Sequence, residues 1–315
     1  MMQDLLLIGT FPRLAQDLID TEFRCHSLAD IEGDAALRAS VRAIITRSNT
    51  VVPAVVIGQL PGLGMIATCG VGYDLIPVEV ATARGIVVSN TPEVLNTAVA
   101  ELCVGMLLAM LRQIPAADRF TRSGAWRSGA FPLGVSLAGK RIGIVGLGRI
   151  GKEIAARLAP FGVTLSYYGR TDQRIAERFE PDLHQLARDS DILILTAPGG
   201  RGTEHMIDAG VLDALGPHGY LLNIARGSVV KEDDLIAALE RGAIAGAALD
   251  VFDAEPAINP RFFTLDNVVL SPHLASATNE TRMAMARLTL DNLHQFFRDG
   301  SALTPVPLPA TEDKP

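Results

Sequence analysis

Short apolar runs alternate with amphipathic stretches along most of the chain. In the C-terminal two thirds, helix-like patterns such as 150–158 and 231–240 separate most of six apolar runs, which are 141–145, 164–168, 192–196, 220–224, 244–249 and 268–270. Nearly continuous apolar strands that alternate with helices are typical of a parallel sheet covered by helices on both faces. The chain from Lys140 onward is therefore predicted to be a doubly wound α/β domain.

The N-terminal part repeats this alternation more weakly. Its strand candidates are 5–8, 43–46, 65–68 and 86–88, and glycines and prolines mark the turns between them. A helix over 96–113 is the expected connector, and an amphipathic helix over 279–297 is expected to pack back on the first domain. The predicted division is a substrate (catalytic) domain of residues 1–95 and 284–315 and a dinucleotide-binding domain of residues 96–283.

Composition agrees with two domains and narrows the class of partner. With 315 residues the chain exceeds the usual size of a single core, and its net charge of −7 argues against a general nucleic-acid or anionic-membrane surface. The three cysteines lack C-x-x-C spacing, and neither a signal peptide nor a bilayer-spanning run is visible. We expect a cytoplasmic protein with no nucleic-acid partner, no membrane association and no metal site.

The loop "GLGRIG" follows the strand "RIGIV" and opens the helix "IGKEIAARL". Its glycines would allow a tight turn, the approach of backbone to a pyrophosphate and close packing of helix against strand. In this strand–turn–helix context the loop predicts dinucleotide binding, with contacts from Gly146, Gly148, Arg149, Ile150 and Gly151.

The next strand ends in Gly169, Arg170 and Thr171, where a carboxylate usually meets the adenosine ribose. An acid would accept hydrogen bonds from a 2′-hydroxyl but repel a 2′-phosphate, whereas arginine can bind phosphate oxygens in a bidentate way. These residues therefore favour NADPH over NADH. The alternative is that Arg170 is a solvated cation at a strand end.

Polar residues also follow three later strands, in "LLNIARGSVV", "AALDVFDAEP" and "VVLSPHLASAT". Because ligands of doubly wound sheets bind outside the carboxyl ends of the strands, Arg226, Asp250, Glu255 and His273 are expected to converge there. Taken singly, three of them have an ordinary alternative: Arg226 as a capping cation, Glu255 as a surface acid and His273 as a structural histidine.

The combination of GLGRIG, N-I-A-R-G, L-D-V-F-x-x-E-P and S-P-H resembles the D-2-hydroxyacid dehydrogenase family over nearly the whole chain. The Gly-Arg strand end makes it most similar to the NADPH-dependent glyoxylate/hydroxypyruvate reductases of that family. The resemblance implies a Rossmann-type cofactor domain, a smaller flavodoxin-like substrate domain, a homodimer and a cleft between the domains. It also implies reduction of small 2-keto acids to D-2-hydroxy acids.

The same resemblance implies a catalytic set of Arg226, Glu255 and His273. Arg226 would hold the substrate carboxylate and polarise the keto oxygen. Glu255 would hydrogen-bond the imidazole and fix its orientation, and His273 would give a proton to the carbonyl oxygen as hydride arrives from the nicotinamide.

Further contacts follow from the family's pattern. Asp250 matches the position that holds the nicotinamide amide, and the backbone N–H groups near Val71 and Gly72 match a carboxylate-binding loop, although a simple turn is the alternative. Other matching positions are Thr203, Ile224, Ala225 and Ser276 for the cofactor, and Arg47 and Ser48 for the substrate.

Two features depart from the family's pattern, and a third, Trp126, matches that of some members. Ala275 replaces a glycine that commonly follows "H-x", so the nicotinamide contact is expected to be reshaped around Ser276. Arg201 in "TAPGGRGTEH" is a second candidate partner of a 2′-phosphate, with a surface cation as the alternative. Trp126 follows "RSGA" as in members where the dimer partner lends this residue to the substrate pocket; a core tryptophan is the alternative.

Two other functions remain open at this point. A dehydrogenase of phosphoglycerate, phenylpyruvate or a phosphonate would use the same core residues. The second open function is that of a non-enzymatic, nucleotide-sensing binding protein, because fold alone never determines function.

Overall fold

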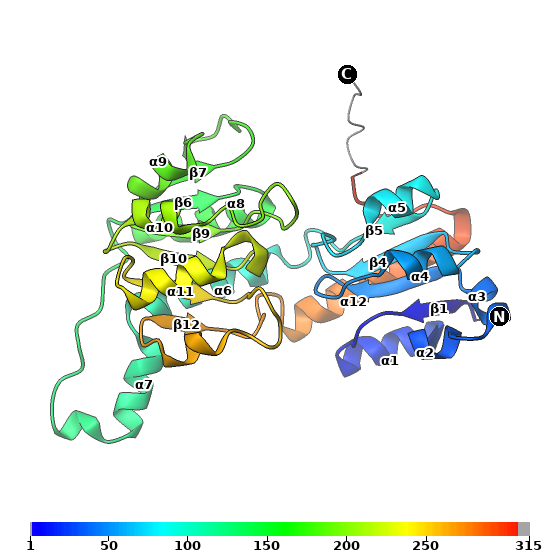
Figure 1. Cartoon of the computed structure of the whole chain (residues 1–315), viewed down its shortest axis with the longest axis horizontal. Coiled ribbons are helices and arrows are strands. Elements are labelled where there is room, and N and C mark those ends of the chain that lie inside the picture. The colour runs from blue at the N-terminus through cyan, green and yellow to red at the C-terminus, as the bar shows by residue number, and fades with distance from the viewer. Residues whose placement is uncertain (1, 308–315) are drawn as a thin grey trace. The chain divides into compact units, whose positions relative to one another are not determined.

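A computed structural model describes residues 2–307. Contacts divide the chain into two compact units, the residues up to Leu95 together with those from Thr278 on, and Asn96–Ala277 (Figure 1). The chain returns to the first unit at Thr278, whereas the sequence analysis placed the return at residue 284. The reason is that the last helix begins at Asn279, so its first turn packs with the rest of the helix. Residues 308–315 of the predicted first domain lie outside the described part.

The first unit contains a five-stranded parallel sheet with the strand order β2-β1-β3-β4-β5. This is the flavodoxin-like order expected for the smaller domain. The strands are β1 Asp4–Leu7, β2 Arg24–His26, β3 Ala43–Arg47, β4 Met65–Cys69 and β5 Val87–Ser89.

Helices cover both faces of this sheet because its central strands are apolar on both sides. On one face α1 (Arg13–Glu22) and α12 (Asn279–Asp299) enclose a core around Ile45, Met65 and Leu293. On the other face the core around Ile44 and Ile66 is covered by α2 Leu28–Ile31, α4 Ala54–Gln59 and α5 Val78–Ala83, and α3 Ala35–Ser40 precedes β3.

The second unit contains a seven-stranded parallel sheet in the order β12-β11-β10-β9-β6-β7-β8. The chain starts at β6 in the middle, moves outward to β8, then crosses to β9 and continues to the other edge, which is the doubly wound Rossmann pattern. The strands are β6 Arg141–Val145, β7 Thr164–Tyr168, β8 Arg178–Phe179, β9 Ile192–Leu195, β10 Tyr220–Asn223, β11 Gly246–Leu249 and β12 Val268–Leu270. The expected fold class, two doubly wound parallel-sheet domains, is confirmed.

Two helix layers cover the second sheet. One contains α6 (Asn96–Leu111) and α8 (Arg149–Leu158), which pack against each other. The other covers a core around Leu193, Leu221 and Leu249 and contains α9 Leu183–Arg188, α10 Ala209–Leu215 and α11 Glu232–Glu240. The remaining helical segments are α7 Ile114–Arg122, η1 Ala125–Arg127, η2 Ala159–Phe161, η3 Gly227–Val229 and η4 Pro260–Thr264.

Two edge strands, β2 and β8, carry no apolar run that would predict them. Both are short and partly exposed, and each pairs with one neighbour only. Within residues 2–307, no single helix is long and apolar enough to cross a membrane; α6 and α7 pass that test only as a pair bent by 59°.

Candidate active site

The glycine loop after β6 exposes the N-terminus of α8. Gly148 is the N-cap, and because it has no side chain it does not cap the first turn of the helix. A Cβ atom at Gly148 would meet nothing within 4 Å, so there is room beside this helix end. The positive end of the helix dipole and free N–H groups suit a pyrophosphate.

The other two glycines of the loop are required by packing. Gly146 has a φ of +96°, and a Cβ atom there would lie 2.8 Å from the Ala197 backbone. A Cβ atom at Gly151 would lie 2.8 Å from the Gly146 carbonyl oxygen, which already accepts a hydrogen bond from the Thr196 hydroxyl. The loop thus fits a dinucleotide by its shape as well as by its sequence.

The end of β7 presents a cation where most such sites present an acid. Arg170 and Thr171 are exposed, and neither makes a side-chain hydrogen bond or ion pair with residues 2–307. Asp172 is the next acid along the chain, but its Oδ1 accepts from the Tyr167 hydroxyl at 3.1 Å and from the Arg174 N–H at 2.8 Å.

The segment after β9 contains two of the predicted cofactor residues. Thr203 donates its hydroxyl to the Pro198 carbonyl at 2.6 Å, and its N–H to Gly200 at 3.0 Å, which closes a tight turn. Arg201 lies in this turn, exposed and without a partner among the described residues. The turn therefore presents a free guanidinium to solvent.

A carboxylate–imidazole pair lies at the carboxyl edge of the same sheet. His273, after β12, and Glu255, after β11, approach to 2.7 Å between Nδ1 and Oε2. Both side chains are about three-quarters buried, with exposed fractions of 26% and 24%. Nδ1 must be the donor to an ionised carboxylate, so Nε2 is the nitrogen left for a substrate.

Several groups hold Glu255 in its ionised form. Burial alone would raise the pKa of this carboxyl group, but the hydrogen bond and charge of His273, the Phe252 N–H at 3.1 Å and the charge of Arg226 together lower the pKa below its ordinary value. The ionised carboxylate can therefore orient the imidazole through Nδ1.

Asp250 determines the backbone of the loop that carries His273. It is fully buried, and its carboxylate accepts hydrogen bonds from the Ser271 hydroxyl at 2.5 Å, the Leu274 N–H at 2.7 Å and the Ala275 N–H at 2.9 Å. His273 itself has a φ of +55°, a strained conformation for a residue with a side chain. The role found for Asp250 is thus to hold this loop, besides any contact with a nicotinamide amide.

Arg226 follows β10, next to the loop that carries Glu255. Asn223 fixes its backbone by donating from Nδ2 to the Arg226 carbonyl at 2.9 Å and accepting from the Ala225 N–H at 3.0 Å. A Cβ atom at Gly227 would overlap the backbone of Phe252, so only glycine allows the two loops to touch. Asn223 and Gly227 were missed from the sequence, although the Gly of "IARG" was a possible signal.

The residues after His273 show why alanine is tolerated. Ala275 is buried and has no positive φ, and its N–H is the third donor to Asp250. A glycine is therefore not required at this position. Ser276 is half-buried and lies in this loop after β12. Ile224 and Ala225 are buried and lie in the loop after β10.

The first unit brings its predicted substrate residues together at the carboxyl ends of β3 and β4. Gly70 lies directly against the Ser48 side chain, and Asn90 donates to the Val71 carbonyl at 2.8 Å. Among the described residues no backbone acceptor is found for the N–H groups of Val71 and Gly72, as an anion-binding loop requires. Arg47 donates to the Thr10 carbonyl at 3.0 Å.

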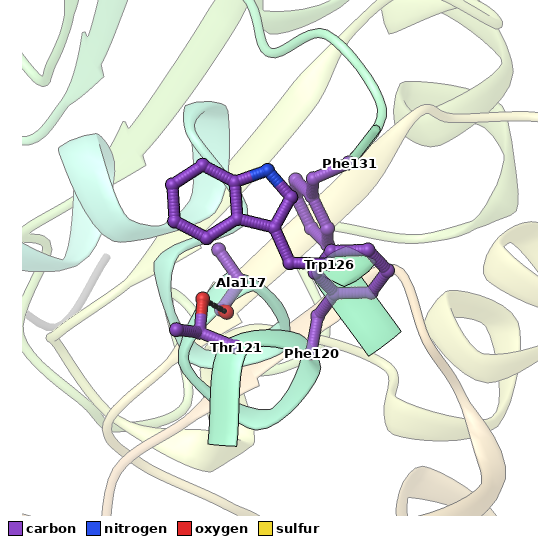
Figure 2. Close-up of a pocket in the computed structure, with 5 residues that line it drawn as sticks. All are labelled: Ala117, Phe120, Thr121, Trp126 and Phe131. Carbon is purple, nitrogen blue, oxygen red and sulfur yellow. Dashed lines mark hydrogen bonds between the residues drawn. The ribbon is translucent and has the colours of Figure 1, made fainter. Parts of the chain in front are cut away.

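Trp126 lies on η1, beyond α7, in a segment that extends away from the sheet of the second unit (Figure 1). Figure 2 shows its indole beside a shallow pocket lined by Phe120 and Phe131, whose ring centroids are 5.3 Å apart. Trp126 is 70% exposed, and Ile114 and Leu133 in the same segment are also exposed. The tryptophan is therefore not a core residue of its own chain.

Within residues 2–307, no group of three His, Cys, Asp or Glu side chains is placed to hold a metal ion.

Comparison with known proteins decides the family. Residues 104–275 match the model of the D-isomer specific 2-hydroxyacid dehydrogenase NAD binding domain. The chain is 42% identical over 304 residues to 2-ketogluconate reductase of Gluconobacter oxydans, covering 96% of this chain and 98% of the relative. It is 44% identical over 270 residues to the Arabidopsis thaliana glyoxylate/hydroxypyruvate reductase HPR2, covering 85% and 86%.

This chain is a member of the D-2-hydroxyacid dehydrogenase family. Among solved structures, it resembles the NADPH-dependent glyoxylate/hydroxypyruvate reductase of Sinorhizobium meliloti in complex with NADP and malonate, with a TM-score of 0.92, 41% identity and 97% coverage of both chains. The dehydrogenase fold thus extends over both units.

The Glu255–His273 contact of this dehydrogenase predicts a defined pH dependence of stability. Because the pKa of Glu255 is lowered on folding, its stabilising contribution is fully present above its unfolded pKa and is lost as pH falls through the folded one. We expect Glu255→Gln to reduce the free energy of unfolding by about 1–2 kcal/mol near pH 7, and by progressively less as the pH falls below the unfolded value of about 4.5.

Urea unfolding of both proteins between pH 3.5 and 7.5 measures this difference. The control is Glu204→Gln, which changes an exposed acid of the same unit. A difference between wild type and Glu255→Gln that does not vary with pH would contradict the ion-pair interpretation.

Proposed function

We propose that this dehydrogenase reduces small 2-keto acids, foremost glyoxylate and hydroxypyruvate, to D-2-hydroxy acids with NADPH. The observation that carries the proposal is the Glu255–His273 pair at the carboxyl edge of a dinucleotide-binding sheet. Relatives named glyoxylate/hydroxypyruvate reductase, and a similar structure that holds NADP, support both substrate and cofactor.

Each residue of the set has a distinct task in the proposed reaction. Bound NADPH supplies the hydride. Arg226 binds the substrate carboxylate and polarises the keto oxygen. In the first unit, the backbone N–H groups of Val71 and Gly72 are candidates for binding a carboxylate. His273 gives the Nε2 proton to the keto oxygen, while Glu255 holds Nδ1–H and so aims the ring.

We assign the cofactor's phosphates to two parts of the second unit. The N-terminus of α8 receives the pyrophosphate, through the backbone from Gly146 to Gly151. Arg170 and Thr171 receive the 2′-phosphate, and Arg201 is a candidate second cation for it. Their freedom from other partners supports this assignment.

We further propose a homodimer in which the segment around Trp126 contacts the partner. Its exposed Ile114, Trp126 and Leu133 support an interface, because apolar side chains gathered on one surface segment mark interaction sites. In this proposal Trp126 reaches the substrate pocket of the partner subunit and Arg47, with Ser48, faces the substrate in its own.

A second substrate class has specific support. The relative from Gluconobacter oxydans is named 2-ketogluconate reductase and is covered over 98% of its length. A longer, hydroxylated 2-keto acid is therefore the next candidate.

We retain a cytoplasmic location as a prediction, supported by three free cysteines, and fractionation of the producing cells tests it.

Activity against a keto-acid panel tests the proposed function. With NADPH we expect turnover of glyoxylate and hydroxypyruvate. His273→Gln should lower kcat by about 10²–10⁴-fold, because the proton donor is lost. The dissociation constant of NADPH, measured by titration calorimetry, should change by less than about twofold, since no proton transfer is involved in binding. The panel also includes 2-ketogluconate; near-normal turnover by the variant would refute the role of His273.

Replacing Arg170 tests the assignment of the 2′-phosphate. We expect Arg170→Ala to raise the dissociation constant of NADPH by about tenfold or more, since a charged hydrogen bond is lost, and to leave that of NADH within about twofold. Arg188→Ala, at an exposed position of α9 in the same unit, is the control. Equal effects on the two cofactors would make Arg170 an ordinary surface cation.

Subunit mixing tests the role of Trp126. Sedimentation should give a mass near twice 33.5 kDa, and Trp126→Ala should raise the KM for the keto acid with no change in NADPH affinity. A heterodimer of Trp126→Ala with His273→Gln contains one site with both groups only if Trp126 acts on the partner. Recovery of a normal KM in the mixture supports that arrangement, and the absence of recovery excludes it.

A further inference from the structure

The loop after β7 contains an acid, Asp172. Its carboxylate would repel a 2′-phosphate unless hydrogen bonds held it away from that phosphate. Asp172 lies only two residues after Arg170, in the segment where a ribose-binding carboxylate would favour NADH. Its Oδ1 accepts hydrogen bonds from the Tyr167 hydroxyl and from the Arg174 N–H, at 3.1 and 2.8 Å. Tyr167 is completely buried, so this bond holds the carboxylate oxygen against the base of the loop.

The same tyrosine also binds the next residue. Its hydroxyl accepts the Gln173 N–H at 2.8 Å, and the Gln173 side chain donates from Nε2 to the Leu147 carbonyl at 2.5 Å. Leu147 belongs to the glycine loop. The loop after β7 is thereby tied both to the strand below it and to the segment that receives the pyrophosphate.

Some side chains of the loop are therefore hydrogen-bonded within the protein, and others have no such partner. Tyr167, Asp172 and Gln173 are bonded to one another or to Leu147, whereas Arg170 and Thr171 are exposed and without side-chain partners among residues 2–307. Tyr167 is buried and anchors this network, whereas Asp172 and Gln173 are exposed. Several hydrogen bonds to one buried hydroxyl restrain the conformation of a loop. Restraint before binding raises affinity, because less ordering remains to be done when the ligand arrives.

We propose that Tyr167, Asp172 and Gln173 form a loop staple that selects NADPH over NADH. The staple keeps the Asp172 carboxylate engaged and holds Arg170 and Thr171 in position, so these three are positioning residues and do not touch the cofactor. The inference rests on the proposed assignment of the 2′-phosphate to Arg170. Without the tyrosine hydroxyl, the carboxylate keeps only the hydrogen bond from the Arg174 N–H, and it can then turn toward the phosphate and repel it.

The test measures binding of NADPH and NADH to the full-length protein by titration calorimetry. For Tyr167→Phe we expect the dissociation constant of NADPH to rise about three- to tenfold, as for a lost hydrogen bond, with that of NADH within about twofold. Tyr168→Phe is the matched control, because this neighbouring hydroxyl makes no hydrogen bond with the described residues. Gln173→Met, which keeps size but removes the donor, should shift NADPH affinity in the same direction.

A double variant separates charge from folding. Tyr167→Phe with Asp172→Asn should recover at least half of the lost NADPH affinity, because the released group is then neutral. If Tyr167→Phe and Tyr168→Phe behave alike, or if both cofactors weaken equally, the staple does not select the cofactor. The Arg170→Ala result is read separately: a selective loss there, with no effect of Tyr167→Phe or Gln173→Met, overturns the staple and leaves the phosphate site in place.

Discussion

The buried carboxylate of Asp250 is the constraint on which the catalytic edge depends. A polar group without exposure to water is tolerated only when its hydrogen bonds are supplied, and three donors from the loop after β12 supply them. Because two of these donors are the backbone N–H groups of the adjacent residues Leu274 and Ala275, the carboxylate dictates the path of the chain directly after His273. His273 consequently adopts a left-handed conformation that it would not choose alone, and its ring meets Glu255.

A second constraint works through contact instead of charge. Gly227 allows the loop after β10 to touch the backbone of Phe252, and Phe252 in turn donates its N–H to Glu255. The carboxyl ends of neighbouring parallel strands lie at one edge of a sheet. The contact between Gly227 and Phe252 and the hydrogen bond from Phe252 to Glu255 fix how the loops at this edge are placed. The charge of Arg226 is then near enough to lower the pKa of Glu255. A substrate carboxylate and a keto oxygen would meet a cation and an oriented imidazole on one edge.

The cofactor-binding part of the sheet edge also depends on loops held in place, but its charges are exposed and interact more weakly. The glycine loop combines a helix N-terminus with room for a ligand, and this combination suits any dinucleotide. Selection between NADPH and NADH is left to a short surface loop, where charges are exposed and individually worth little. Holding such a loop in one conformation makes its cations effective, and in this dehydrogenase the buried Tyr167 hydroxyl lies at the centre of the network that does so.

The fold class could be predicted because apolar runs of strand length alternate with helical patterns, and burial on both faces of a parallel sheet leaves such runs almost uninterrupted. Arg226, Glu255 and His273 could be singled out because polar residues stand out directly after such strands. The edge strands β2 and β8 could not be found, since exposed edges need no apolar pattern. Only the tertiary structure revealed that Asp250 binds the histidine loop and that Asp172 is turned onto Tyr167, because side-chain hydrogen bonds leave no periodic trace in the sequence. The sequence by itself determined which chemical groups are present and in which order; three-dimensional packing decided which of them are committed to one another and which remain free for a ligand.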